Sequence, residues 1–157
     1  MPRGQQPSGD LKQVRHAAMG LLARREHGRQ ELYHKLCHKG YSAELCEQAV
    51  DELQAEGLLS DQRYAASYIR ARAERGYGSE RIRQELKEKG VSTSLISAEL
   101  QQAETDWFVL AQEVRLKRFG EIPPADYQER AKQMRFLQYR GFSHEQIRHA
   151  LSQVECL

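Results

Sequence analysis

Apolar residues recur along this chain at the three- and four-residue spacing of amphipathic helices, and glycines and serines interrupt them at intervals. The first pattern places Val14, Ala18 and Leu22 on one face, which predicts a helix from about Leu11 to Glu26. Two more helices are expected, at about 29–39 and 43–57, the second capped by Ser42. No segment alternates with the period of a half-buried strand. The pattern therefore predicts an all-α protein without a sheet.

The same plan recurs further along the chain. Helices are expected at about 60–75, 79–89 and 93–103, and a last set opens near residue 105. In that set the pair Pro123 and Pro124 predicts a helix start, because proline is favoured in the first helical turn. Ser143 and Gln146 have the spacing of a capping box for the final helix.

Three stretches align as imperfect copies of one another, namely residues 35–53, 85–103 and 136–154. Five positions coincide in all three: Leu36, Leu86 and Leu137; Gly40, Gly90 and Gly141; Ser42, Ser92 and Ser143; Cys46, Ile96 and Ile147; Val50, Leu100 and Leu151. A repeat at a fixed period decides the architecture before any local motif does. We predict an elongated array of three tandem three-helix repeats (helix-turn-helix-like units), at 11–57, 58–104 and 105–157. Each repeat is too small to bury much apolar surface alone and must share its core with a neighbour.

Composition fits a soluble protein of the cytoplasm. Residues 1–10 carry proline, glycine and glutamine without an apolar run, so we expect a disordered tail and no signal peptide. No later run approaches the ~20 apolar residues that cross a bilayer, which predicts no membrane contact. The three cysteines form no CxxC pair and indicate no disulfide framework.

One stretch is more specific than the repeat. The segment GLLSDQRYAASYIRARAERGYGSERIRQELKEKGV, residues 57–91, resembles the signature of the RecX family, small bacterial regulators of the RecA recombinase. The matching features are Gly57-Leu58-Leu59, Asp61-x-Arg63-Tyr64-Ala65, the Gly76/Gly78 pair, Arg81-Ile82-x-x-Glu85-Leu86 and Lys89-Gly90-Val91.

This resemblance implies a non-enzymatic protein of tandem three-helix repeats that works without a cofactor. Such a protein binds RecA and the RecA–DNA filament, and limits filament growth, ATP hydrolysis and strand exchange. Its DNA contact is expected to be weak and independent of sequence. The resemblance also places it in homologous recombination, DNA repair and the SOS response, and we expect it to act as a monomer.

Charge is segregated along the chain. Residues 1–40 hold eight Lys and Arg against three Asp and Glu, whereas residues 41–60 hold five acids and no cation. Residues 61–90 are cationic again, and residues 91–106 carry three acids and no cation. Positive charge thus lies on the first two helices of each repeat, and the third helices of the first two repeats are acidic.

Helical geometry then selects a candidate basic face for contact with RecA acids and DNA phosphates. Arg63 and Arg70 lie opposite the packed side of one helix, and Arg83 and Lys87 form an exposed i, i+4 pair on the next. Other cations could extend this face: Arg24, Arg25, Arg29, Arg115, Lys117 and Arg118. A merely solvated face is the competing interpretation. Arg72 and Arg75 are expected to pack on rings or pair with an acid, and Arg81 to pair with Glu85 or Glu88.

Two other classes of binding protein remain as alternatives. LKEKGVSTSLI, residues 86–96, resembles a helix-turn-helix, which would make the chain a DNA-binding transcriptional regulator. Its second helix offers no Lys or Arg to bases or phosphates, and its counterpart in the first repeat is strongly acidic. The third class is a helical-repeat scaffold that only binds proteins.

A metal site or an enzyme is less favoured. His34 and His38 stand one turn apart beside Cys37, the arrangement of a possible zinc site. The repeat instead places Cys46 at a core position, equivalent to Ile96. We expect no metal, and no phosphate-binding loop follows a strand. Trp107 and Phe108 are expected to pack between repeats.

Overall fold

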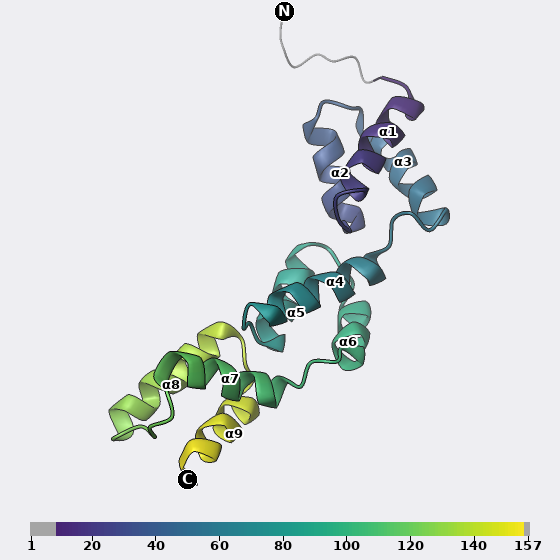
Figure 1. The fold of residues 1–157 in the computed structure, drawn as a ribbon. Coiled ribbons are helices and arrows are strands. Elements are labelled where there is room, and N and C mark those ends of the chain that lie inside the picture. Colours follow the sequence, from purple (N-terminus) through teal and green to yellow (C-terminus); the bar gives the residue numbers. More distant parts are fainter. Residues whose placement is uncertain (1–8, 156–157) are drawn as a thin grey trace, which may run out of the picture. The chain divides into compact units, whose positions relative to one another are not determined.

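The structure, a computed structural model, describes residues 9–155, and this range contains nine helices and no strand (Figure 1). The helices are α1 (Leu11–Leu22), α2 (Arg29–His38), α3 (Ala43–Ala55), α4 (Asp61–Glu74), α5 (Ser79–Glu88), α6 (Thr93–Gln102), α7 (Trp107–Phe119), α8 (Tyr127–Arg140) and α9 (His144–Glu155). The prediction of an all-α chain in sets of three helices is confirmed. The tail expected at residues 1–10 lies outside the described residues, apart from Gly9 and Asp10.

A capping box fixes the start of α1. The Asp10 carboxylate accepts a hydrogen bond from the Gln13 amide at 2.9 Å, and the Gln13 side chain accepts one from the Asp10 amide at 3.2 Å. The helix ends at Leu22, before the expected Glu26. The chain turns after Leu22 because the His27 side chain is buried, with only 1% of the residue exposed. The Nδ1 atom of His27 lies 3.1 Å from the Arg25 carbonyl oxygen.

The expected helix start at Pro123 and Pro124 is wrong. α8 begins at Tyr127, where the Asp126 carboxylate accepts from the Glu129 amide at 2.8 Å. A proline has no side-chain acceptor for the free amides of a first helical turn, whereas Asp126 supplies one. The capping box of α9 is confirmed, since Ser143 and Gln146 each accept a hydrogen bond from the other's amide.

The described chain divides into two compact units. One holds residues 9–67 with Leu86–Ile96, and the other holds Tyr68–Glu85 with residues 97–155. In the first unit α1, α2 and α3 pack on one another, and in the second α7, α8 and α9 do. The middle three-helix segment, α4 to α6, is thus shared between the two units.

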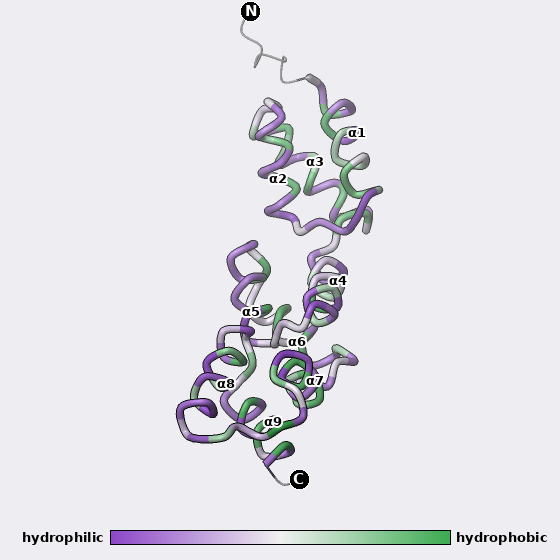
Figure 2. Tube along the Cα trace, turned by 60° about the vertical axis from the view of Figure 1, so that its left-hand side comes forward, coloured by the Kyte–Doolittle hydropathy of each residue, from purple (hydrophilic) through white to green (hydrophobic). Residues whose placement is uncertain are grey.

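Each unit has its own apolar core. The buried residues of the first are Val14, Ala18, Leu32, Leu36, Cys46, Ala49, Val50, Leu53 and Leu59. Those of the second include Ala111, Leu137, Phe142, Ile147, Ala150 and Leu151. Leu36, Leu86 and Leu137 are each 0% exposed, which confirms them as core positions. Fully burying one such side chain contributes about 1.5–3 kcal/mol. In Figure 2 much of α5 and α8 has the colour of hydrophilic residues.

A similar contact, between the start of one helix and the glycine turn after another, occurs once in each unit. In the first, the start of α2 lies against the turn after α5, where a side chain at Gly90 would overlap Gln30. In the second, the start of α5 lies against the turn after α8, and the Glu80 amide donates to the Gly141 carbonyl at 2.9 Å. Gly90 and Gly141 have φ of 86° and 101°, which glycine adopts without strain. Successive three-helix segments therefore meet through their glycine turns.

Candidate protein and nucleic-acid interface

Three of the predicted binding cations form ion pairs with acidic side chains of the same molecule. Arg63 donates to Glu26 at 2.9 Å, and Arg25 to Glu31 at 2.7 Å. Arg29 lies between two acids of α3, Glu47 and Asp51, at 2.8 and 2.6 Å. Partial burial disfavours charge on Arg29, yet its hydrogen bonds to these two carboxylates raise its pKa. These cations would have to give up intramolecular partners in order to bind another molecule.

The expectation that Arg115 lies on an exposed basic face is wrong. Its side chain is inside unit two, with 2% of the residue exposed. It donates to the Gln133 side chain at 2.9 Å and to the carbonyl oxygens of Gly120 and Ile122 at 2.9 and 3.0 Å. Burial lowers the pKa of Arg115, but a guanidinium stays protonated in proteins. Arg115 ties the loop after α7 to α8.

The remaining predicted cations differ in how far they are free to bind. Within residues 9–155, five are exposed and form no ion pair: Arg24, Arg70, Lys87, Lys117 and Arg118. Arg83 is half-buried and donates to the Ser97 hydroxyl at 2.9 Å. Arg24 and Lys87 belong to the first unit, and the other four belong to the second.

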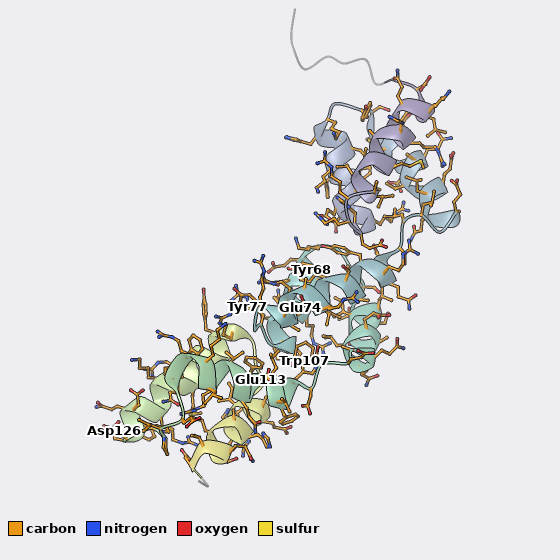
Figure 3. All side chains as sticks on the ribbon, in the orientation of Figure 1. Tyr68, Glu74, Tyr77, Trp107, Glu113 and Asp126 are labelled. Carbon is orange, nitrogen blue, oxygen red and sulfur yellow. The ribbon has the colours of Figure 1, made fainter. Side chains whose placement is uncertain are left out.

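Lys117 and Arg118 line an open pocket of about 500 Å³ in the second unit. Its other cations are Arg75 at the end of α4 and Arg140 at the end of α8, which the sequence reasoning did not select. The apolar part of the lining comes from Leu110, Val114 and Phe136, and two acids, Glu74 and Glu113, also contribute (Figure 3). All four cations follow or close a helix, where the helix dipole favours positive charge. The pocket offers anion-binding groups beside an apolar wall.

Tyr77 lies in the turn between α4 and α5 (Figure 3), and three guanidinium groups contact its ring. The guanidinium carbons of Arg72, Arg81 and Arg140 lie 3.9, 4.5 and 4.8 Å from its ring centroid. Each contact is within the ~6 Å range of cation–π attraction. Arg140 also donates to the Arg75 carbonyl oxygen at 3.1 Å. Tyr77 therefore fixes these cations near the pocket.

Glu85 anchors this arrangement from α5. It accepts hydrogen bonds from Arg72 at 2.9 Å, Arg81 at 3.3 Å and the Tyr68 hydroxyl at 2.8 Å. Burial alone would raise the pKa of Glu85, but the hydrogen bonds from Arg72, Tyr68 and Arg81 outweigh it and lower the pKa. Burial and the hydrogen bond to Glu85 raise the pKa of Tyr68 to about 12, so its hydroxyl remains a donor at neutral pH. The predicted roles of Arg72 and Arg81 are confirmed, whereas Arg75 is exposed and, within residues 9–155, forms neither an ion pair nor a ring contact.

The sequence reasoning missed the cluster around Tyr77. Helical geometry places Arg72 and Arg75 on the tyrosine side of α4. The sequence signal that could have revealed the cluster was an aromatic residue between two glycines at 76–78, flanked by cations.

Phe108, expected in a core, is 39% exposed, and its ring meets His149 edge-on at 5.4 Å.

His34, His38 and Cys37 were considered as zinc ligands and were not favoured. Cys46 is fully buried, as the repeat predicts. In residues 9–155 no group of three or more His, Cys, Asp or Glu side chains is placed to hold a metal ion. No helix in that range is both long and apolar enough to cross a membrane.

Three family models match the chain in succession. They describe the first, second and third three-helix domains of RecX, and they match residues 15–53, 60–100 and 104–151. The chain belongs to the RecX family. The resemblance carried by residues 57–91 is thereby confirmed.

Curated RecX relatives extend the match over most of the chain. The regulatory protein RecX of Pseudomonas entomophila is 50% identical over 139 residues, which are 88% of this chain and 90% of that protein. The regulatory protein RecX of Vibrio vulnificus is 47% identical over 142 residues, 90% of this chain and 93% of that one. The chain is thus a member of a family named for regulation.

Solved RecX structures share the fold. The crystal structure of RecX from Lactobacillus salivarius superposes with a TM-score of 0.79 at 20% identity, covering 94% of this chain and 97% of that one. A second crystal structure of a regulatory protein RecX gives a TM-score of 0.77 at 25% identity, over 91% of this chain and 71% of that one. The helical architecture is therefore that of RecX.

Proposed function

We propose that this protein binds RecA and the RecA–DNA filament and inhibits filament growth, ATP hydrolysis and strand exchange. It acts by binding and not by catalysis. The observation that carries the proposal is its 50% identity to a curated RecX regulatory protein over nearly the whole of both chains.

The distribution of free and paired charge supports a binding role for the first two helices of each segment. On α3, Glu47 and Asp51 form ion pairs with Arg29. Glu52 and Glu56 form ion pairs with Arg15. The unpaired cations of the predicted face lie on α4, α5 and α7 or follow α1. Unpaired exposed cations retain their full attraction for an acidic partner, whereas paired ones must first exchange partners.

DNA contact is proposed as an auxiliary interaction through phosphates. Lysine and arginine side chains bind phosphates without reading sequence, so the contact should be weak at physiological salt and similar on unrelated strands. The helix-turn-helix alternative is less well supported. The second helix of that motif, α6, contains no Lys or Arg to contact bases or phosphates.

Binding to the filament tests the proposal directly. RecA is assembled on immobilised single-stranded DNA with a slowly hydrolysed ATP analogue, and this protein is passed over filament-coated and bare DNA. We expect tighter binding to the coated DNA. Equal or weaker binding to the filament would overturn the proposal. We extend it to a monomer in the cytoplasm, where RecA works, and light scattering coupled to size exclusion checks the monomeric state.

A further inference from the structure

Aromatic rings and guanidinium groups alternate across the second unit. In order, the series runs through Tyr139, Arg81, Tyr77, Arg140, Phe136, Arg118 and Phe119. The successive distances from guanidinium carbon to ring centroid are 5.3, 4.5, 4.8, 5.5, 5.6 and 5.6 Å. We call this set the ring–guanidinium series. Three of its members, Arg140, Phe136 and Arg118, also line the cationic pocket that contains Lys117.

The two ends of the series differ in exposure. Phe119 and Phe136 are half-buried and meet edge-on at 5.3 Å. Tyr139 is 77% exposed, although Arg81 lies near its ring and donates to its backbone carbonyl at 3.3 Å. A ring that served only to pack would be expected to be covered. Tyr139 instead presents an oriented aromatic surface to solvent.

The chemistry of the series matches one class of partner. A single-stranded nucleic acid carries flat, unpaired bases on a chain of phosphates, and such strands bind where aromatic side chains stack on bases and cations follow the backbone. Bases within a duplex are already stacked on one another and offer no free face. An acidic protein segment would match the cations, but it would leave the exposed ring unused.

We propose that Tyr139 and Arg81 form a stacking site for an unpaired base of single-stranded DNA. Phosphates of the same strand are bound by the cations of the adjoining pocket, Arg75, Lys117 and Arg118. The inference rests on the DNA contact of the proposed function and gives that contact a preference for single strands. It does not depend on how RecA responds.

Tyr127 provides a matched control. It stands at the start of the same helix, α8, and is 82% exposed, but it is absent from the ring–guanidinium series. Replacing either tyrosine by alanine removes an equally exposed ring from one helix. A nonspecific loss of surface aromatics would affect both variants alike.

The experiment compares binding of labelled oligothymidine, an abasic strand of equal length and a hairpin duplex. Tyr139→Ala should weaken oligothymidine binding about tenfold, because stacking on one aromatic contributes about 1–3 kcal/mol per base. Tyr139→Phe and Tyr127→Ala should bind it as the wild type does. The abasic strand, which keeps phosphates but has no base to stack, should bind weakly to both the wild type and Tyr139→Ala.

A second measurement locates the contact. Strands carrying 5-iodouracil are irradiated with the protein, and the crosslinked peptide is identified by mass spectrometry. We expect the crosslink at Tyr139 and not at Tyr127. Wild-type binding by Tyr139→Ala, or equal weakening of duplex and single strand, overturns the stacking site and leaves RecA inhibition standing. Conversely, Tyr139-dependent strand binding by a protein that does not affect RecA supports the stacking site and removes the proposed inhibition.

Discussion

Gly78 lies directly against the backbone of Gly141. Its amide donates to the Arg140 carbonyl oxygen at 2.8 Å, and a Cβ built on Gly78 would come within 2.6 Å of the Phe142 amide nitrogen. The obstacle is backbone, which cannot swing aside as the end of a flexible side chain can. A side chain at position 78 therefore forces the two backbone segments of the second unit to move apart.

The first prediction follows from this close approach. Gly78→Ala should lower the free energy of unfolding by about 1–3 kcal/mol, the usual cost of overpacking. Gly20→Ala is the control: Gly20 lies inside α1 with nothing within 4 Å of an added Cβ. That change should stabilise by about 0.5–1 kcal/mol, because alanine is the better helix former. Urea melts followed by circular dichroism measure both. A neutral Gly78→Ala variant would contradict the close approach of the two backbones.

The sequence repeat identified the glycines at which helices end, but it revealed only part of their structural role. Gly40, Gly90 and Gly141 end helices with positive φ, as an aligned C-terminal glycine predicts. The alignment did not reveal that Gly90 faces Gln30 or that Gly141 faces Arg81. Those contacts join segments about sixty residues apart, and local periodicity carries no information about them.

A second prediction tests the equivalent leucines. Leu36→Ala, Leu86→Ala and Leu137→Ala should each destabilise the protein by about 2–5 kcal/mol, because all three side chains are fully buried and leave a cavity. Denaturant melts of the three single variants provide the measurement. Losses near zero at all three positions would show that the sequence repeat has no structural role.

The third prediction concerns Glu85 and pH. Its pKa is lowered in the folded protein, so its contribution to stability is present above about pH 4.3, the unfolded value, and is lost as the pH falls through the folded pKa. Glu85→Gln should therefore cost about 1–3 kcal/mol at pH 7, where it removes charged hydrogen bonds to Arg72 and Arg81. The difference from wild type should shrink as the pH falls below about 4.

The matched control for this prediction is Glu80→Gln. Glu80 lies on the same helix and is exposed, and its side chain forms no ion pair within the described residues. The Glu80→Gln variant should lose no more than about 0.3–1 kcal/mol, the contribution of an acid in the first turn of a helix, and so should stay closer to wild type than Glu85→Gln at pH 7. Urea midpoints at neutral and acid pH separate the two variants. A Glu85→Gln deficit that stayed constant with pH would mean that the carboxylate charge is not what stabilises the cluster.

The candidate face was predictable only where local geometry decides exposure. Lys117 and Arg118 are exposed on the last turn of α7, as expected for cations there. Arg63 and Arg29 were assigned to the same face, but their acids lie elsewhere in the chain, Glu26 between α1 and α2 and Asp51 on α3. Sequence spacing does not identify such partners. Arg115 has the same charge as its neighbours and differs only in facing the core.

A fourth prediction separates binding cations from ordinary surface charge. The double variant Lys117→Glu with Arg118→Glu should keep the circular-dichroism signal of the wild type, since surface changes usually alter stability by about ±0.5 kcal/mol. Its affinity for single-stranded DNA should fall, and the salt dependence should flatten by about one unit of slope for each phosphate that the variant no longer binds. Fluorescence anisotropy at several salt concentrations gives both quantities.

Lys132→Glu with Arg135→Glu is the corresponding control. Both residues are exposed on α8, form no ion pair within residues 9–155 and do not line the pocket. This variant changes the net charge by the same amount. If it lost DNA affinity as fully as the pocket variant, total charge and not the pocket would explain binding.

The rate of ATP hydrolysis by RecA on single-stranded DNA tests the central claim most directly. Purified protein is added in increasing amounts to RecA, DNA and ATP, and phosphate release is followed with time. A protein that limits RecA filaments should lower the steady rate progressively as its concentration rises. A rate that stays constant or increases across that range would contradict the account.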